Sequence, residues 1–282
     1  MKNFLILTKE DTDRMQSFLE EIIQFLWDNG ADGQYDVLKK EDASKQIDVP
    51  EWYDCILTVG GDGTMIRAAV RTIESGLPLI GINKGHLGYL CDLDENTYQD
   101  ALKRLINDDF DLEERMLLEG RVVSADGTPV SDEIVAINDI VISSHNGLQV
   151  VHLSVDVNGE ELTSFNGDGI IFATPTGSTA YNLSASGPIV DPQTSLILMT
   201  PLNAHVVGMR SIVLDDTAQV RAHVKRRNQE ELNAVAAFDG TTAITLHDGD
   251  SLEVEKSTRT VKFIRLSRIN FLDRIRSKLQ AD

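Results

Sequence analysis

The pattern of apolar residues changes near Leu118, and this change constrains the fold more than any other feature of the chain. Before Leu118, short continuous apolar runs alternate with longer segments whose apolar residues recur at helical spacing. The expected strands are Phe4–Leu7, Cys55–Val59 and Leu79–Ile82, and the expected helices are Met15–Leu26, Met65–Ile73 and Tyr98–Ile106. Strands that alternate with helices are typical of a parallel, doubly wound α/β sheet.

After Leu118 the chain consists of short β-branched runs separated by turn sequences such as Asn158-Gly159 and Asp239-Gly240. The expected strands are 121–123, 134–137, 140–142, 151–157 and 170–173, with helical character at 178–186 and again at 268–279. We therefore expect an N-terminal α/β domain over residues 1–118 and a β-rich, sandwich-like domain over residues 119–267. The C-terminal helix, residues 268–282, is expected to pack back on the first domain.

Charge and cysteine content restrict the partners and the compartment. The 282 residues include 26 Lys and Arg against 45 Asp and Glu, a net charge of −19, which disfavours nucleic acid and anionic membranes. The basic cluster Lys225–Arg227 is followed at once by Glu230 and Glu231, so we expect a solvated hairpin loop there. No apolar run reaches membrane-spanning length, no signal peptide is evident, and Cys55 and Cys91 are typical of reduced core residues. These features favour a cytoplasmic protein.

A glycine-rich sequence lies where an expected strand gives way to an expected helix. Gly60-Gly61-Asp62-Gly63-Thr64 follows the Cys55–Val59 run directly. Ligands of α/β folds bind at the carboxyl ends of strands, and the N–H groups of a following helix attract phosphate. A simple glycine turn with a solvated aspartate is the alternative. The sequence is not a Walker motif, because no lysine follows the glycines.

A second segment, residues 165–188, joins a Gly-Asp-Gly turn, an apolar strand and a stretch rich in small and hydroxyl side chains. Small residues allow the backbone to approach a ligand closely, and hydroxyl groups supply short polar contacts. A flexible Ser/Thr linker is the alternative, but Tyr181 and Leu183 are unlike linker residues.

Together these segments resemble the motifs of the NAD kinase family, which occur here in the family's order from about residue 1 to 270. The motifs that carry the resemblance are Gly60–Thr64, Gly81–Asn83 with Gly85–Leu90, Asn138-Asp139, and Gly167–Gly169 through Thr174–Tyr181. The resemblance implies a phosphotransferase that moves a phosphoryl group from ATP, or from another donor such as polyphosphate, to NAD, giving NADP. It also implies an α/β domain with a β-sandwich-like domain, in a homodimer or homotetramer.

The resemblance implies roles for individual residues. Asp62, beside Gly63, matches the general base that acts on the 2′-hydroxyl of the adenosine ribose. Arg67 matches a ligand-contacting position, and Asn138 with Asp139 matches the pair that holds the adenosine end of NAD. The other positions that line the dinucleotide site match Asp168, Thr179, Ala180, Tyr181, Asn182 and Ser184.

His205 and Arg210 resemble a later segment of the family and are candidate phosphate contacts, with a purely structural His205 as the alternative. Three positions depart from the family: Asn166 replaces a frequent basic residue, Ser211 a proline and Thr241 a glutamine. We expect Mg²⁺ to arrive with the donor phosphates, because the sequence shows no His/Cys cluster and no carboxylate cage.

Two other functions remain open. Lipid or sphingoid kinases share a Gly-Asp-Gly motif, although this chain lacks an apolar or basic membrane-docking surface. A non-catalytic NAD sensor is the second alternative.

The apolar strands of the second domain also lead us to expect a homo-oligomer. The runs 134–137, 140–142 and 170–173 carry more apolar surface than a thin sandwich is expected to hide, and such surface usually marks a subunit interface. A monomer covered by its own domains is the alternative.

Overall fold

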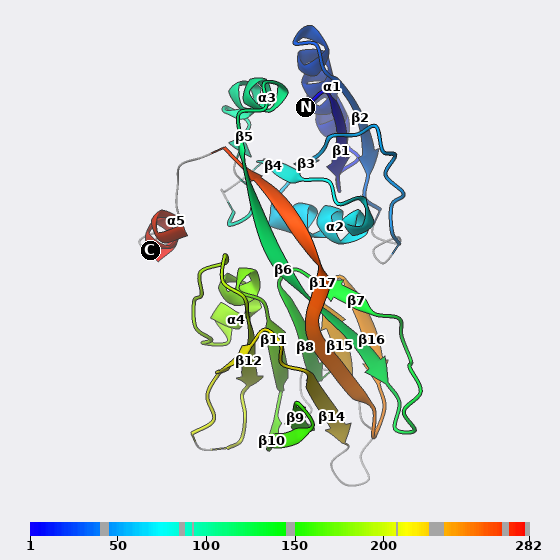
Figure 1. Ribbon diagram of the computed structural model, residues 1–282, viewed down its shortest axis with the longest axis vertical. Helices are drawn as coiled ribbons and strands as arrows, with labels where there is room; N and C mark the ends of the chain where they lie inside the picture. The colour runs from blue at the N-terminus through cyan, green and yellow to red at the C-terminus, as the bar shows by residue number, and fades with distance from the viewer. Residues whose placement is uncertain are drawn as a thin grey trace. The chain divides into compact units, whose positions relative to one another are not determined.

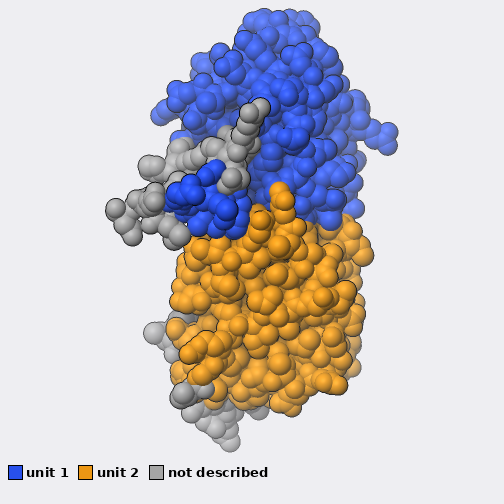
Figure 2. Space-filling model, turned by 60° about the vertical axis from the view of Figure 1, so that its left-hand side comes forward, with its two compact units in different colours: residues 1–115, 260–282 blue, residues 116–259 orange. Residues whose placement is uncertain are grey.

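The computed structural model describes residues 1–39, 45–84, 88–91, 93–144, 150–206, 208–225, 234–266 and 271–279. The chain divides into two compact units, one formed by Met1–Arg115 with Thr260–Asp282 and the other by Met116–Arg259 (Figure 2). Two long strands, β6 (Asp111–Val123) and β17 (Ser251–Arg265), contain residues of both units (Figure 1).

The first unit is the α/β part of the chain. Its other elements are β1 (Asn3–Thr8), α1 (Asp13–Asp28), β2 (Asp32–Val37), β3 (Cys55–Val59), α2 (Asp62–Arg71), η2 (Ile73–Ser75), β4 (Leu79–Asn83), β5 (Leu93–Asp94), α3 (Tyr98–Ile106) and α5 (Phe271–Leu279). Strands β2, β1, β3 and β4 lie in that order and are parallel, and β5 pairs with β4 in the same direction. The expected parallel α/β sheet is confirmed.

Apolar periodicity explains the helices of this unit. The Thr12 hydroxyl accepts the Met15 N–H at 3.2 Å and so caps the start of α1. Apolar residues spaced along α1 and α3 then join residues of β1, β3 and β4 in one core. The α1 members of that core include Met15, Leu19, Ile22 and Leu26.

Strand β2 was missed by the sequence analysis. Its sequence, Asp-Gly-Gln-Tyr-Asp-Val, is polar, and most of its residues are exposed. The strand forms because Asn3–Thr8 offers a parallel partner, with Asn3 opposite Asp32 and Thr8 opposite Val37. The start of the expected C-terminal helix, Arg268–Asn270, lies outside the described residues, and α5 is observed from Phe271.

The second unit contains a six-stranded antiparallel sheet and the antiparallel part of the eleven-stranded sheet whose other strands are parallel. Its other elements are β7 (Ile134–Ala136), β8 (Asp139–Ser144), β9 (Val151–Val157), β10 (Glu160–Gly167), β11 (Gly169–Ala173), η3 (Thr176–Thr179), α4 (Tyr181–Ser184), β12 (Leu196–Leu202), β13 (Ile212–Asp215), β14 (Val220–Lys225), β15 (Ala234–Phe238) and β16 (Thr242–Leu246). One sheet has the order β13-β12-β11-β8-β15-β16, and the other contains β10-β9-β14-β17, with β6 beside β17 and β7 beside β6.

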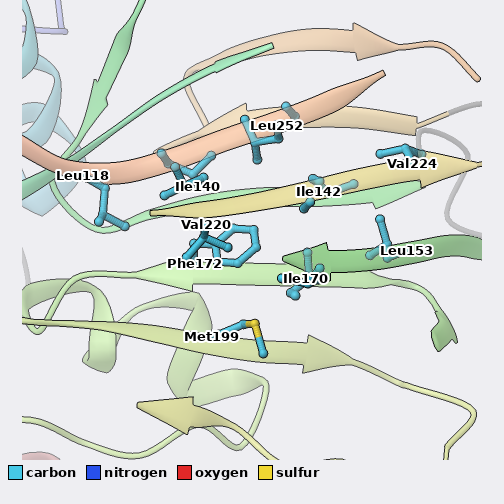
Figure 3. Packing of buried hydrophobic residues seen from close by; sticks show 14 of the residues in the cluster. Leu118, Ile140, Ile142, Leu153, Ile170, Phe172, Met199, Val220, Val224 and Leu252 are labelled. Atoms are coloured by element: carbon cyan, nitrogen blue, oxygen red, sulfur yellow. The ribbon is translucent and has the colours of Figure 1, made fainter. Parts of the chain in front are cut away.

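Figure 3 shows the core between these sheets, where Ile140, Phe172 and Met199 approach Val220 and Leu252. The β-sandwich-like expectation is therefore confirmed. The short helix α4 falls within the segment expected to be helical, 178–186, and η3 overlaps the start of that segment.

The expectation that strands of this unit leave apolar surface for a subunit interface is wrong. Ile140, Ile142 and Ile170 are buried between the sheets. The alternate residues of the same strands, including Val141 and Ile171, are buried on the other face of the six-stranded sheet. Ala185 and Val190, from the segment between α4 and β12, pack on that face, and the sequence analysis did not place them there.

Cys55 and Cys91 are both buried, and neither forms a disulfide among the residues that the structure describes. Burial raises the pKa of the Cys55 thiol, which disfavours its reactive thiolate form. No helix among the described residues is long and apolar enough to cross a membrane.

Candidate active site

The glycine loop joins β3 to α2 as the sequence predicts. Gly60 has φ +149°, and a Cβ there would lie 2.3 Å from the Thr64 hydroxyl oxygen, so a side chain is excluded. Gly61 occupies the N-cap position and Asp62 begins α2. Because Val59 lies opposite Thr8 of β1 and Ile82 of β4, the loop lies at the carboxyl edge of the parallel sheet. Ligands of α/β folds bind at this edge.

Backbone N–H groups hold the Asp62 carboxylate in place. Oδ2 accepts the Tyr89 N–H at 2.7 Å, and Oδ1 accepts the N–H groups of Leu90 at 3.1 Å and Cys91 at 3.3 Å. A Cβ on Gly88 would lie 2.1 Å from Oδ1, so this contact requires glycine at position 88. A carboxylate oxygen can accept two hydrogen bonds. Oδ2 can therefore accept another from a substrate hydroxyl.

The Asp62 carboxylate also affects the ionisation of the Tyr89 side chain. Burial raises the pKa of the Tyr89 phenol, and the negative charge of Asp62 raises it further. The phenol is therefore a neutral hydrogen-bonding group beside the carboxylate near neutral pH.

Two cationic residues, Arg67 of α2 and Lys9, belong to the same unit as Asp62. Arg67, one turn into α2, has a buried Nε that makes no hydrogen bond to the described part of the chain. An orphaned buried donor of this kind is suited to a ligand oxygen. Lys9 was missed by the sequence analysis, and its Nζ lies 3.4 Å from the position that a Cβ on Gly63 would occupy. Pairing of β1 with β3 explains this proximity, because Lys9 follows Thr8.

In the second unit, Asn138 and Asp139 lie at the start of β8. The carboxylate of Asp239 accepts the N–H groups of Ile137, Asn138 and Asp139 at 2.8, 2.8 and 3.1 Å. The Asp239 N–H in turn donates to the Asp139 carbonyl at 3.0 Å. These bonds fix the backbone that carries the Asn138 and Asp139 side chains.

The Thr174–Thr179 segment packs against the same backbone. The Thr174 N–H donates to the Asn138 carbonyl at 2.9 Å, and the Thr174 hydroxyl donates to the Ile137 carbonyl at 2.5 Å. A Cβ on Gly177 would lie 2.0 Å from the Asn138 carbonyl oxygen, so position 177 must be glycine. The small residues noted in the sequence thus allow two backbone segments to pack closely.

Asp139 and Asp239 form an acidic pair. Burial raises the pKa of Asp139 to about 7, and the charge of Asp239 adds to this rise, while a Tyr181 N–H opposes it. Burial also raises the pKa of Asp239 to about 6, against three opposing N–H bonds. Three N–H bonds favour the ionised form of Asp239, whereas only one opposes the protonation of Asp139, so Asp139 is the carboxyl of this pair that is more readily protonated.

Residues 179–184 differ in their availability to a ligand. Tyr181 and Ser184 are exposed, and Thr179 and Ala180 are half-buried. Asn182 is fully buried, donates to the Ser178 and Pro188 carbonyls, and accepts the Thr200 hydroxyl at 2.7 Å. In this structure the Asn182 amide therefore stabilises its own segment.

Asp168 lies in the β10–β11 connection, where its carboxylate accepts the Asn203 amide at 2.6 Å. His205 and Arg210 lie between β12 and β13, and both are exposed. The His205 N–H donates to the Asn166 carbonyl at 2.7 Å, and the Arg210 guanidinium donates to the Met209 carbonyl.

The predicted residues of this unit thus form two groups. Ala173 lies opposite Asp139, whereas Gly169 lies opposite Ser143, so Asp168 and Asp139 lie at opposite ends of the β8–β11 pair. Four residue steps, from Gly169 to Ala173, separate these ends, about 13 Å along the strand. The structure brings Asn138, Asp139 and Tyr181 together, and it brings Asp168 and His205 into a separate group.

The three departures have local explanations. Asn166 Oδ1 lies 3.1 Å from His152 Nδ1. The Ser211 hydroxyl lies 2.9 Å from the Thr200 hydroxyl oxygen and donates to it, because the Thr200 proton is directed at Asn182, and the Thr241 hydroxyl donates to the Phe238 carbonyl. Of the second expected motif, Gly85–Leu87 lies outside the described residues.

The sequence matches two protein-family models and many known proteins. Residues 39–110 match the family described as the ATP-NAD kinase N-terminal domain, and residues 137–266 match its C-terminal domain. An NAD kinase of Agathobacter rectalis is 38% identical over 285 residues, covering 99% of each chain. An NAD kinase of Ruminiclostridium cellulolyticum is 35% identical, covering 99% of this chain and 98% of its own.

Two solved structures share the fold. A yeast NADH kinase in complex with NADH has a TM-score of 0.84 and 25% identity, covering 99% of this chain and 87% of the yeast chain. An Archaeoglobus fulgidus NAD kinase in complex with ATP has a TM-score of 0.78 and 22% identity, covering 98% and 99%.

Proposed function

The chain belongs to the NAD kinase family, and we propose that it transfers a phosphoryl group from ATP to the 2′-hydroxyl of the adenosine ribose of NAD. The observation that carries this proposal is Asp62, presented by a glycine loop at the carboxyl edge of the parallel sheet. Its carboxylate is oriented by three backbone N–H groups and retains an acceptor position on Oδ2.

Asp62 would orient the ribose hydroxyl and accept its proton late in the reaction. Phosphoryl transfer depends mainly on positioning and on neutralisation of charge. A fixed carboxylate suits this task, because the attacking oxygen must align with the donor phosphorus before the proton leaves.

The adenosine end of NAD would be held in the second unit. Ionised Asp139 has two oxygens that can accept hydrogen bonds from two ribose hydroxyls, and Asn138 adds an amide. Exposed Tyr181 and Ser184, with Thr179 and Ala180, would line the rest of the dinucleotide. Asp168, His205 and Arg210 would contact other parts of it.

Charge on the donor would be met by Arg67, Lys9 and Mg²⁺. Arg67 Nε is an unused donor among the described residues, and Lys9 lies beside Gly63. Mg²⁺ usually retains phosphate oxygens as ligands, and both Asp62 oxygens already accept N–H bonds, so a metal held mainly by donor phosphates fits this site. When bound, Mg²⁺ supplies neutralisation of the phosphate charge.

We also propose a cytoplasmic homo-oligomer. Reduced, buried cysteines suit a reducing compartment, and family resemblance supports the assembly. Polyphosphate is a further candidate donor, because the proposed contacts recognise phosphate and magnesium rather than a base.

A substrate comparison tests the proposed function. The protein would be incubated with Mg²⁺-ATP and, in parallel, with NAD, a diacylglycerol or a sphingoid base. We expect phosphorylation of NAD alone. Phosphorylation of a lipid in place of NAD would favour a lipid kinase, and NAD binding without turnover would favour a sensor.

A further inference from the structure

Asp239 reaches the proposed adenosine site from a distant part of the sequence. It lies in the turn between β15 and β16, 102 residues after Ile137. Asp239 and Gly240 both have positive φ, +47° and +61°, as in the tight turns that join antiparallel strands. Pairing of β15 with β8, with Phe238 opposite Ile140, brings this turn beside Asp139.

The Asp239 carboxylate holds a bend in the backbone. Successive residues of an extended strand point in opposite directions, so three consecutive N–H groups do not converge on one acceptor. Here the N–H groups of Ile137, Asn138 and Asp139 do converge on Asp239. The convergence occurs where β7 has ended at Ala136 and β8 begins at Asp139.

The opposite side of the same bend is fixed as well. The Ile137 and Asn138 carbonyls accept hydrogen bonds from Thr174, and Gly177 packs against the Asn138 carbonyl. The Thr174 contacts leave the N–H groups of residues 137–139 to a separate partner, and Asp239 is that partner. Hydrogen bonds from two separate segments, one with Asp239 and one with Thr174, therefore hold the bend.

We infer that Asp239 is a positioning residue for NAD: its carboxylate sets the backbone that aims Asn138 and Asp139 at the adenosine ribose. This inference rests on the proposed function, because it assumes that Asn138 and Asp139 hold the adenosine end. Asp239 acts through the backbone and touches no reacting atom.

Replacement by asparagine tests this role with little change in size. An asparagine keeps one acceptor oxygen and replaces the other with an NH₂ donor, which would face a backbone N–H. At least one N–H of the bend then loses its partner.

For Asp239→Asn we expect the KM for NAD to rise about tenfold or more, from the loss of a buried hydrogen bond. The KM for ATP should stay within about twofold, because ATP does not depend on the bend. Steady-state kinetics with each substrate varied in turn measures both values, and thermal unfolding measures stability.

Asp250→Asn is the matched control. Asp250 is also buried, lies at the other end of β16, and accepts the His247 N–H at 2.7 Å within a turn. A purely structural role predicts that both variants lower Tm and leave the KM for NAD unchanged. That result would overturn the inference.

Asp139→Ala separates the inference from its premise. If Asp139→Ala raises the KM for NAD and Asp239→Asn does not, the positioning role is wrong and the proposed function stands. If Asp139→Ala leaves the KM for NAD unchanged, the proposed role of Asp139 is wrong, and the inference about Asp239 is wrong as well. If Asp239→Asn does not fold, Asp239→Glu keeps both acceptor oxygens but displaces them by one methylene, and the same KM criterion applies.

Discussion

Asp62 depends for its position on the N–H groups of Tyr89, Leu90 and Cys91. Backbone N–H groups hold a carboxylate more rigidly than a lysine or arginine side chain does, because such a side chain can rotate away. The proposed base is therefore fixed before the substrate binds, as positioning catalysis requires. The contact also explains why Gly88 belongs to the site, since a side chain there would collide with Oδ1.

Asp62→Asn should lower turnover by about 10²–10⁴-fold, the usual contribution of a general base, while NAD binding is largely kept. Assays of NADP formation would measure turnover, and calorimetric titration with NAD would measure binding. Asp94→Asn is a suitable control, because Asp94 also accepts backbone N–H bonds, from Asn96 and Thr97. Turnover within about threefold of wild type would place the base elsewhere.

The raised pKa of Asp139, about 7, predicts a pH dependence of NAD binding. Below pH 7 the neutral carboxyl loses one acceptor position, and above pH 7 the carboxylate can accept hydrogen bonds from both ribose hydroxyls. Affinity should therefore increase as pH rises, by up to about tenfold between pH 6 and 8 for one group. Calorimetry at both pH values measures the affinity for NAD, and Asp139→Asn should remove most of the difference, leaving only the smaller effect of Asp239, whose pKa is about 6. Equal affinity of the wild type at both pH values would refute the assignment.

At the scale of elements, the β3–α2 connection determines where Asp62 lies. Gly60 has a backbone conformation that side chains rarely adopt and contacts Thr64, whereas Gly61 has open space around its Cβ position. The two adjacent glycines therefore serve different purposes. Gly60 is required by the turn itself, and Gly61 leaves room at the helix N-terminus.

Gly60→Ala should destabilise the protein by about 2–3 kcal/mol or more, because the added Cβ meets Thr64 in a strained backbone. Gly61→Ala should cost no more than about 1 kcal/mol, the scale of an N-cap change. Urea unfolding of both variants measures the difference. Equal losses would show that Gly60 has no special steric role.

The elements and residues found from the sequence are those with local signals. The β3–α2 loop and Asp62 follow from a buried strand, glycines and an amphipathic helix in succession. Strand β2 gave no such signal, because its residues are mostly polar and it forms by pairing with β1. Lys9 and Asp239 were missed for the same reason: each acquires its neighbours through strand pairing between distant segments.

For the whole molecule, the fold limits which surfaces could form the interface of the proposed homo-oligomer. The strands expected to expose apolar surface are buried within the second unit. Exposed apolar residues of that unit lie instead at other positions, including Tyr181, Val206 and Val213. Such residues, together with exposed Trp27 and Trp52 of the first unit, are available to an interface.

We expect an active homodimer or homotetramer, with inactivation on dissociation. Light scattering after size exclusion, combined with activity across the peak, tests this expectation against a chain mass of 31.2 kDa. A fully active 31.2 kDa species at low concentration would contradict it.

We propose that this chain phosphorylates the adenosine ribose of NAD at its 2′-hydroxyl, and that Asp62 orients that hydroxyl. The most direct test is NMR of the product formed from NAD and Mg²⁺-ATP, with coupling between phosphorus and the ribose protons used to assign the position. We expect a single phosphate monoester at the 2′ position. A phosphate at the 3′ position, or on the nicotinamide ribose, would contradict it.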